Sequence, residues 1–596
     1  MKKIFNFVAI MALAICFASC ENFLDTTNYW SKDSSNFPVN TTDADQMITG
    51  IYNNLNITIA DEVHKNHFLW NNIASDDCLG GGGNDDVDAQ AEDLLLNNGA
   101  DMYNTFYVER YQGIARANAA IESLASCGVT GDKLMQYYGE AFFLRAWFYY
   151  ELATMFGNIP VPIASTADAT LPQLSGEALW GRILEDCKIA ADIMPSVRSI
   201  GDGHVDKYAA EALLGRAWLF ASGFYGLDSI TLPAYENEGA NVNIAEGTKI
   251  TKSDVGKYIT DCVNNSGYSL VDDPHNLWPY TNRCSVEDED SPWKGKGYKW
   301  VQDDGAVNPE AIFMIKFNTQ ADWGTTMGYS NFTALYMGVR GQEDNADHFP
   351  FGTGWGMCSV SPQFVADWQK AEPSDKRRDA SIINVNNGIW NYKFNGENNT
   401  QETGYYQTKI MAVTAYDSEG ELRTSFFNVM YPGMAYASGD SEDKDYNMLA
   451  DMAIIRFAEV LLMDAEINGN QASFDKVRAR AGLESKPISE ENIRNERRWE
   501  LCFEGIRFDD IRRYGEAYAA AALDKQDGVP CHNCSEVEGT NTASKFNGGY
   551  GNRYKATKGF VKIPSSQISL SAGAGAEYTF TQNEGWGSGT DFAGWN

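Results

Sequence analysis

Apolar residues at helical spacing recur along this chain, and the pattern limits its fold more than any other feature. In the segment 139–157, Ala141, Leu144, Phe148 and Leu152 fall on one face of a helix. The same reasoning predicts helices at 44–55, 177–194 and 208–224. The last of these is rich in alanine and glycine, which allow neighbouring helices to approach closely. We therefore expect antiparallel helix pairs in the first part of the chain.

The chain changes character after about residue 240. Gly, Asn, Asp, Trp and Tyr dominate residues 241–440, with short strand-like pieces such as Ala311–Phe317. Helical patterns return at 452–467, 474–481 and 489–514, the last with Ser489 in the N-cap position. The predicted fold is mainly α. It is a tetratricopeptide-like helical scaffold with a large loop-rich part that contains short β-strands. We divide it into a helical region at 41–240 and a second region at 241–596, in which 241–440 is a loop-rich insert for ligand binding.

The first twenty residues read as an export signal with a lipidation site. Lys2 and Lys3 precede an apolar run from Ile4 to Phe17, and the small residues Ala18 and Ser19 lead into Cys20. The run is shorter than the roughly 20 residues that span a bilayer. We expect cleavage after residue 19, lipid (palmitate) on Cys20 and a polar tether at 20–40. Plain secretion with an unmodified Cys20 is the alternative.

Charge and cysteine usage exclude some classes of protein. The formal net charge is -34, from 47 basic and 81 acidic residues, and such a chain repels nucleic acid. Eleven cysteines are scattered without a framework pattern. Cys531 and Cys534 form a single CxxC in what we expect to be a polar loop, and such a pair could be a local disulfide, a redox pair or half a zinc site. No second ligand pair accompanies it, which favours a local disulfide or two free thiols over half a zinc site.

Metal sites are not supported by spacing. His64 and His67 are three residues apart but have no acidic partner at a fixed spacing. The acidic stretch 85–93 suggests Ca²⁺, but it lacks the glycine and terminal glutamate of an EF-hand loop. We expect the glycine-rich stretch 76–93 to be a flexible, solvated loop. No cofactor is predicted.

The densest charge cluster lies in the segment 493–515, which reads IRNERRWELCFEGIRFDDIRRYG. Glu500 and Glu504 are four residues apart and share a helical face, with Arg497 and Arg507 three residues outside them. Arginines at this spacing favour ionised carboxylates with low pKa, whereas a general acid needs a raised pKa. The cluster therefore indicates a structural ion network. HExxH, GxSxG and P-loop patterns are absent, so we expect no catalytic activity.

The segment 493–515 resembles the signature of the SusD/RagB family. Other blocks resemble that family in the same order along the chain: Phe23–Asp25, Tyr111–Asn118, Gly139–Pro160, Arg456–Leu462, Val477–Leu483, Ile563–Pro564 and Gln582–Trp586. Glu584 stands where the family often has proline. The resemblance covers nearly the whole mature chain. It implies a surface-exposed outer-membrane lipoprotein that lies as a lid on a SusC-like TonB-dependent transporter and captures glycans, or in some branches peptides, for import.

Loop aromatics beside polar residues are the candidate ligand contacts, because sugars lay their C–H faces on flat rings. By position within the family, the favoured platform residues are Trp70, Trp278, Tyr280 and Trp323. The function we expect is capture of oligosaccharide or polysaccharide at the cell surface. A peptide-capturing member of the same family is the first alternative, and a secreted glycosidase using Glu500 or Glu504 is the second.

Overall fold

The computed structural model describes residues 37–595 except 57–64, 100, 167–169, 290, 304, 318–330, 341–350, 352–353, 387–391, 393–398, 412, 417–421, 425–449 and 534–535. Cys20, Trp323, His64 and Cys534 therefore lie outside the described residues. The predicted mainly helical fold is confirmed, and the short strands form only two-stranded antiparallel sheets among the described residues.

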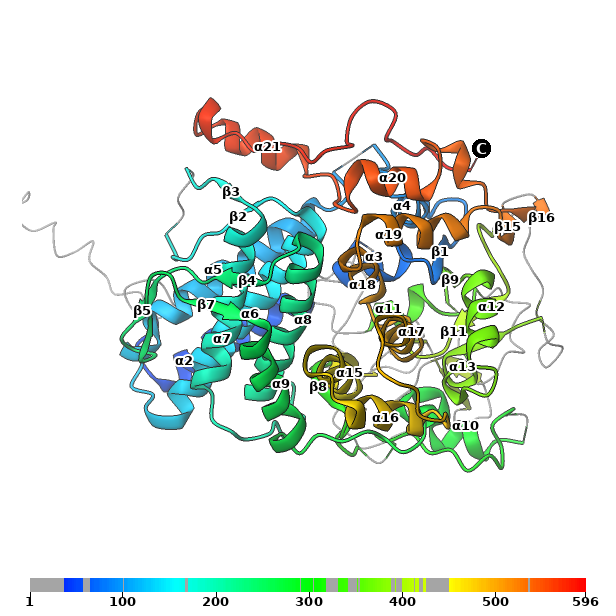
Figure 1. Cartoon of the computed structure of the whole chain (residues 1–596), viewed down its shortest axis with the longest axis horizontal. Coiled ribbons are helices and arrows are strands. Elements are labelled where there is room, and N and C mark those ends of the chain that lie inside the picture. The colour runs from blue at the N-terminus through cyan, green and yellow to red at the C-terminus, as the bar shows by residue number, and fades with distance from the viewer. Residues whose placement is uncertain are drawn as a thin grey trace, which may run out of the picture.

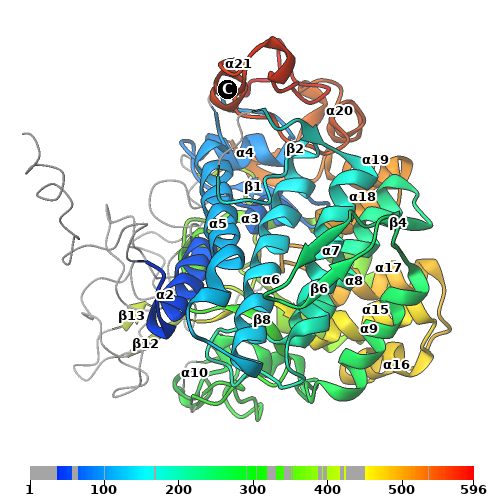
Figure 2. The same cartoon turned by 90° about the vertical axis from the view of Figure 1, so that its left-hand side faces the viewer.

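The helical scaffold is a stack to which both ends of the described chain contribute. Its first members are α2 (Thr41–Tyr52), α5 (Asn104–Ser123), α6 (Gly131–Phe156), α7 (Gly176–Ile193), α8 (Lys207–Tyr225) and α9 (Lys252–Asn265). From α5 to α9 each helix packs against the next, and α15 (Phe457–Asn468) continues the stack from α9. Helices α16 (Gln471–Arg480) and α17 (Glu490–Leu501) then pack on α15, and α18 (Arg507–Arg513) packs on α8. Figures 1 and 2 show this stack.

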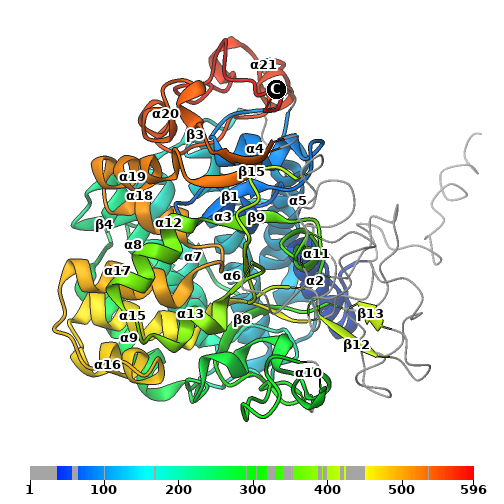
Figure 3. The same cartoon turned by 90° about the vertical axis from the view of Figure 1, so that its right-hand side faces the viewer.

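The remaining elements are short. The other helices are α3 (His67–Ile73), α4 (Val87–Asp93), α10 (Arg283–Glu287), α11 (Phe332–Tyr336), α12 (Pro362–Ala371), α13 (Lys376–Ser381), α19 (Glu516–Leu523), α20 (Tyr550–Thr557) and α21 (Ser565–Ala572). The strand pairs are β1 (Cys78–Gly81) with β9 (Met357–Val360), β2 (Ile159–Pro160) with β3 (Gln173–Leu174), β4 (Ser229–Thr231) with β7 (Lys249–Thr251), β5 (Tyr235–Asn237) with β6 (Val242–Ile244), β8 (Ala311–Ile315) with β14 (Met452–Arg456), β10 (Ile382–Asn384) with β11 (Tyr405–Gln407), β12 (Thr414–Tyr416) with β13 (Leu422–Thr424), and β15 (Pro530–Asn533) with β16 (Glu536–Thr540). Figure 3 shows the side of the molecule that carries α10 to α13.

Helix ends follow local sequence signals. Thr251 and Asp254 form a reciprocal capping box at the start of α9. At α17 the Ser489 side chain accepts a hydrogen bond from the Asn492 backbone N–H at 3.1 Å, as predicted. Gly226 ends α8 in the left-handed conformation that glycine adopts without strain.

The stretch 76–93 is not the flexible loop that its glycines suggested. It forms β1 and α4, and most of it is buried. A Cβ atom at Gly80 would lie 2.8 Å from the Ala89 carbonyl oxygen, and one at Gly81 would lie 2.3 Å from the Gly356 carbonyl oxygen. The glycines are therefore needed for close backbone approach rather than for mobility.

Two helix predictions were wrong in part. Residues 452–456 form strand β14, which pairs with β8, before α15 begins. The predicted helix 489–514 is two helices, because Phe503 and Gly505 both have positive φ and turn the chain between α17 and α18. A short apolar run fits a strand or a helix equally well, which explains the first error.

Two clusters of buried apolar residues form the interior. The large one runs through the helical scaffold. The smaller one lies in the loop-rich part and is dominated by aromatic rings, among them Trp278, Tyr280, Trp293, Trp300 and Tyr406. Long segments without extended secondary structure need a core of their own, and aromatic side chains supply large buried area. None of the helices within the described ranges is long and apolar enough to cross a bilayer.

Candidate functional site

Aromatic rings of the loop-rich part mostly pack against one another. The Tyr280 ring centroid lies 5.0 Å from that of Trp293 and 5.7 Å from that of Phe351. The Tyr280 hydroxyl donates to the Ala380 carbonyl oxygen at 2.9 Å. Only 1% of Tyr280 is exposed, so its ring offers no face to a sugar. The prediction of Tyr280 as a platform residue does not fit this burial.

Trp70 is also a core residue. It lies in α3, is 1% exposed, and packs edge-on against Phe508 of α18 with centroids 5.1 Å apart. The Arg512 guanidinium lies 5.7 Å from its ring. Trp70 therefore joins α3 to α18, and its predicted role as a platform does not fit its position in the core.

Trp278 lines a pocket, although it too is mostly covered. It separates two short 3-10 helices, Pro274–Leu277 and Pro279–Thr281, and is 8% exposed. Lys409 Nζ lies 5.1 Å and Arg456 Cζ 5.7 Å from its ring centroid. These two cations hold the ring in place by cation–π contact.

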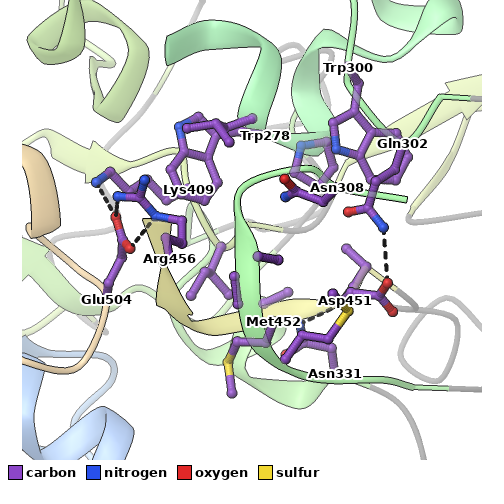
Figure 4. Close-up of a pocket in the computed structure, with 18 of the residues that line it drawn as sticks. Trp278, Trp300, Gln302, Asn308, Asn331, Lys409, Asp451, Met452, Arg456 and Glu504 are labelled. Carbon is purple, nitrogen blue, oxygen red and sulfur yellow. Dashed lines mark hydrogen bonds and ion pairs between the residues drawn. The ribbon is translucent and has the colours of Figure 1, made fainter. Parts of the chain in front are cut away.

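The pocket beside Trp278 has an aromatic wall and a polar rim (Figure 4). Trp300 adds the second ring, and Gln302, Asn308, Asn331 and Asp451 add amide and carboxylate groups. Its volume is about 30 Å³. A water molecule needs roughly 10–15 Å³ of such space, so in this conformation the pocket accepts a hydroxyl group rather than a sugar ring.

Two acceptors in this pocket have no donor within the described ranges. Gln302 Nε2 and Lys316 Nζ both contact Asp451 Oδ2, at 3.0 and 2.8 Å, while Asp451 Oδ1 is buried and accepts no hydrogen bond. Asn331 Nδ2 donates to the Ala450 carbonyl oxygen at 3.0 Å, while its Oδ1 is likewise unpaired. Buried acceptors of this kind favour a hydroxyl donor from water or from a ligand.

The charge cluster of 493–515 is a buried ion network, as predicted, but its partners are not those that helical spacing suggested. Glu504 receives hydrogen bonds from Arg456 and Lys409, and Glu500 from Arg456, Arg480 and Arg377. Arg507 contacts Asp76 instead, at 2.7 Å. The network therefore joins α17 and the turn after it to β14, α13 and α16, and it joins α18 to Asp76, which precedes β1.

Electrostatics within the network oppose acid–base chemistry at the two glutamates. Burial favours the protonated form of Glu500, but Arg480, Arg456 and Arg377 together lower its pKa below the ordinary value. Arg456 and Lys409 lower the pKa of Glu504 against the same effect of burial. Glu496 behaves differently from these two glutamates, because burial outweighs Arg377 and Arg478 and raises its pKa. A glycosidase acid would need a raised pKa at Glu500 or Glu504, and neither has one.

Among the described residues, no group of three or more His, Cys, Asp or Glu side chains is arranged so that it could hold a metal ion. His67 is buried, with Nε2 3.3 Å from Asp509 Oδ2. Cys531 lies on strand β15, not in a loop. The pairing of Cys531 with Cys534 remains a prediction, as do the roles of Cys20 and Trp323.

Comparison with known proteins identifies the family. A family model described as starch-binding and associating with the outer membrane matches residues 22–219, and the model of the SusD family matches residues 309–586. The two matches together span most of the chain. The chain belongs to the SusD family.

Relatives of this SusD family protein are distant in sequence. SusD-like protein P2 of Formosa agariphila is 23% identical over 443 residues, which cover 69% of this chain and 72% of the relative. A solved laminarin-binding SusD-like protein is 22% identical, with a TM-score of 0.65 over 92% of this chain and 100% of the other. Surface glycan-binding protein A from Bacteroides thetaiotaomicron, solved with laminarihexaose, is 18% identical with a TM-score of 0.64 over the same shares. These likenesses establish the shared fold.

Proposed function

We propose that this SusD family protein is a non-catalytic glycan-binding lipoprotein of the cell surface. It captures oligosaccharide or polysaccharide and delivers it to a SusC-like TonB-dependent transporter in the outer membrane. The observation that carries the proposal is the match of both halves of the chain to models of this family, one of them described as starch-binding and associating with the outer membrane. Two solved structures that share its fold are named for laminarin or hold laminarihexaose.

The Trp278–Trp300 pocket is the described part of the ligand site in this proposal. Its unpaired acceptors, Asp451 Oδ1 and Asn331 Oδ1, receive hydrogen bonds from a sugar hydroxyl at the pocket mouth. Trp323 is the proposed stacking platform, because it precedes Asn331 in the same segment of sequence. In this proposal, lipid on Cys20 anchors the protein to the membrane, and residues 21–40 form the polar tether.

Affinity electrophoresis of residues 21–596 through gels that contain laminarin, starch or other neutral polysaccharides tests the proposal. We expect at least one polysaccharide to retard the protein. Trp323→Ala and Asn331→Ala should each reduce the retardation, whereas Val197→Ser, a change at an exposed residue, should leave it intact. Binding to a cationic peptide array together with no retardation by any polysaccharide would favour the peptide-capturing alternative.

Partner contact needs a separate experiment. Extraction of the full-length protein in mild detergent, followed by pull-down, should recover a large β-barrel transporter. Release of sugar from a polysaccharide by the purified protein would instead establish a hydrolase, and loss of that release in Glu500→Gln would locate its acid.

A further inference from the structure

Arg553 is an exception among the buried arginines of this protein. It is 3% exposed and forms no ion pair with a carboxylate of the described residues. Every other buried arginine within the described ranges has a carboxylate within 4.0 Å. Burial alone lowers the pKa of Arg553 to about 10, with no acid opposing it. A buried and uncompensated cation is costly unless an anion approaches it.

The contacts of Arg553 fix its guanidinium and leave one nitrogen unused. Nε donates to the Leu95 carbonyl oxygen at 2.8 Å and Nη1 to the Gly585 carbonyl oxygen at 2.6 Å. Nη2 is buried and has no acceptor among the described residues. The guanidinium lies 4.5 Å from the Trp586 ring, whose Nε1 donates to the Phe560 carbonyl oxygen at 3.0 Å. Both side chains are therefore held rigidly before any ligand arrives.

Arg553 and Trp586 line an open cavity of about 770 Å³ between α20 and the glycine-rich segment 585–590. That volume lies in the range of small-ligand sites. A Cβ at Gly585 would lie 2.6 Å from the Ala556 carbonyl oxygen, so the segment lies directly against α20 there, whereas a Cβ at Gly587 or Gly589 would meet nothing. Figure 1 shows α20 close to the C-terminal end of the chain.

The polar groups of the cavity suit a charged sugar. Asn547 Nδ2 donates to the Gly589 carbonyl oxygen at 3.2 Å, and Asn552 Nδ2 donates to the Asn547 carbonyl oxygen at 2.8 Å. Their side-chain oxygens can accept hydrogen bonds from the hydroxyl groups of a sugar. Lys555 lines the same cavity and adds a second cation. A half-buried indole, two amides and two cations form the combination that binds a sugar ring bearing a carboxylate or sulfate.

We propose that the cavity between α20 and residues 585–590 is a second glycan subsite, specific for the carboxylate or sulfate of an acidic sugar. The anion faces Arg553 and Lys555, and the sugar ring lies against Trp586. The inference rests on the proposed function and extends it, because it names a negatively charged glycan as ligand. On a chain of net charge -34, a local cationic pocket selects an anion that the rest of the surface repels.

Isothermal titration of residues 21–596 with tetragalacturonate, with a sulfated carrageenan tetrasaccharide and with the carboxyl-reduced tetragalacturonate tests the subsite. At least one acidic oligosaccharide should bind, and the reduced neutral form should bind at least tenfold more weakly. Asn552→Asp places a carboxylate in the cavity without removing the hydrogen bonds of Arg553. It should weaken acidic binding at least tenfold, and Lys555→Gln should weaken it to a smaller extent.

Lys296→Gln, an exposed lysine of the loop-rich part, is the matched control and should bind the acidic oligosaccharide as the wild type does. Equal affinity in Asn552→Asp and wild type would overturn the inference, and so would inorganic sulfate binding while neither oligosaccharide binds. If neutral polysaccharides retard the protein in gels but no acidic oligosaccharide binds, the subsite fails and the proposed function stands. If no glycan of either kind binds, the proposed function fails with it.

Discussion

Replacement of Asp93 by asparagine should make the folded protein less sensitive to alkaline pH. Asp93 is the last residue of α4 and is almost fully buried. Its Oδ2 accepts hydrogen bonds from Gln401 Nε2 at 2.7 Å and from the Tyr550 hydroxyl at 2.9 Å, while Oδ1 has no hydrogen-bond partner among the described residues. Burial raises the pKa of Asp93 from 3.8 to about 7 against the effect of these hydrogen bonds.

The sign of the effect follows from the two pKa values. Because the pKa is higher in the folded than in the unfolded chain, the folded state binds the proton more tightly. The contribution of Asp93 to the free energy of unfolding therefore falls as pH rises from about 4 to about 7. Above pH 7 the folded chain carries the full penalty, which is the cost of ionising this buried carboxyl. At about 1.4 kcal/mol per pKa unit, the penalty is about 4 kcal/mol at pH 8 and about 2 kcal/mol at pH 5.

Asparagine keeps an oxygen for the Gln401 and Tyr550 hydrogen bonds and has no charge to bury. Its unpaired amide costs about 1–3 kcal/mol at every pH. Relative to wild type, Asp93→Asn should thus gain about 2–3 kcal/mol in free energy of unfolding between pH 5 and pH 8. Urea unfolding followed by tryptophan fluorescence measures this difference. The exposed Glu577→Gln is the control and should reproduce the wild-type pH profile. A stability difference between Asp93→Asn and wild type that is the same at both pH values would refute the reasoning.

Three further outcomes are expected. Glu504→Gln should lower the free energy of unfolding, measured by urea unfolding, by about 3–5 kcal/mol, because Arg456 and Lys409 lose a buried counter-charge. A change below about 1 kcal/mol would contradict the stabilising role of the ion network. Gly505→Ala should lower the free energy of unfolding by more than about 1 kcal/mol in the same assay, because the φ of Gly505 is +70° and a Cβ there would lie 2.5 Å from Phe68 Cδ2. A variant as stable as the wild type would contradict the positive-φ turn between α17 and α18. Cys20→Ala should move the protein from the membrane to the soluble fraction on centrifugation, and continued sedimentation with membranes would rule out the lipid anchor.

Helices with long, regular apolar patterns could be predicted from sequence, because the pattern repeats over several turns. Helices α6, α7 and α8 begin and end within a few residues of their predicted bounds, apart from the start of α6. The break between α17 and α18 could not be predicted from periodicity, since charged residues continue at helical spacing across it. The Glu-Gly pair at 504–505 was the available signal, because glycine favours the positive φ that the turn requires.

Aromatic site residues were harder to predict, because a loop tryptophan has the same polar sequence neighbours whether it binds a ligand or forms a core. Trp70 and Tyr280 proved to be buried, each for a tertiary reason that local sequence does not contain. Trp70 packs against Phe508, and Tyr280 packs against Phe351. Arg553 could not be predicted as a site residue from the sequence, for a related reason. Its significance depends on having no carboxylate nearby, and only the folded structure shows which residues are nearby.

The segment that best identifies the family is also the one least able to bind a ligand. Its arginines and glutamates are buried and contact each other and distant parts of the chain, as when Arg498 and Arg507 both reach Asp76. Such contacts hold together segments that are far apart in the sequence and place opposite charges beside those they bury. In the two sites proposed above, the ligand contacts are instead Asn331 and Asp451 in one pocket and Arg553 in another, each with a polar atom that has no partner among the described residues. On these proposals the buried ion network stabilises the fold, whereas other residues bind the ligand, so a change of ligand would not require a change in the network.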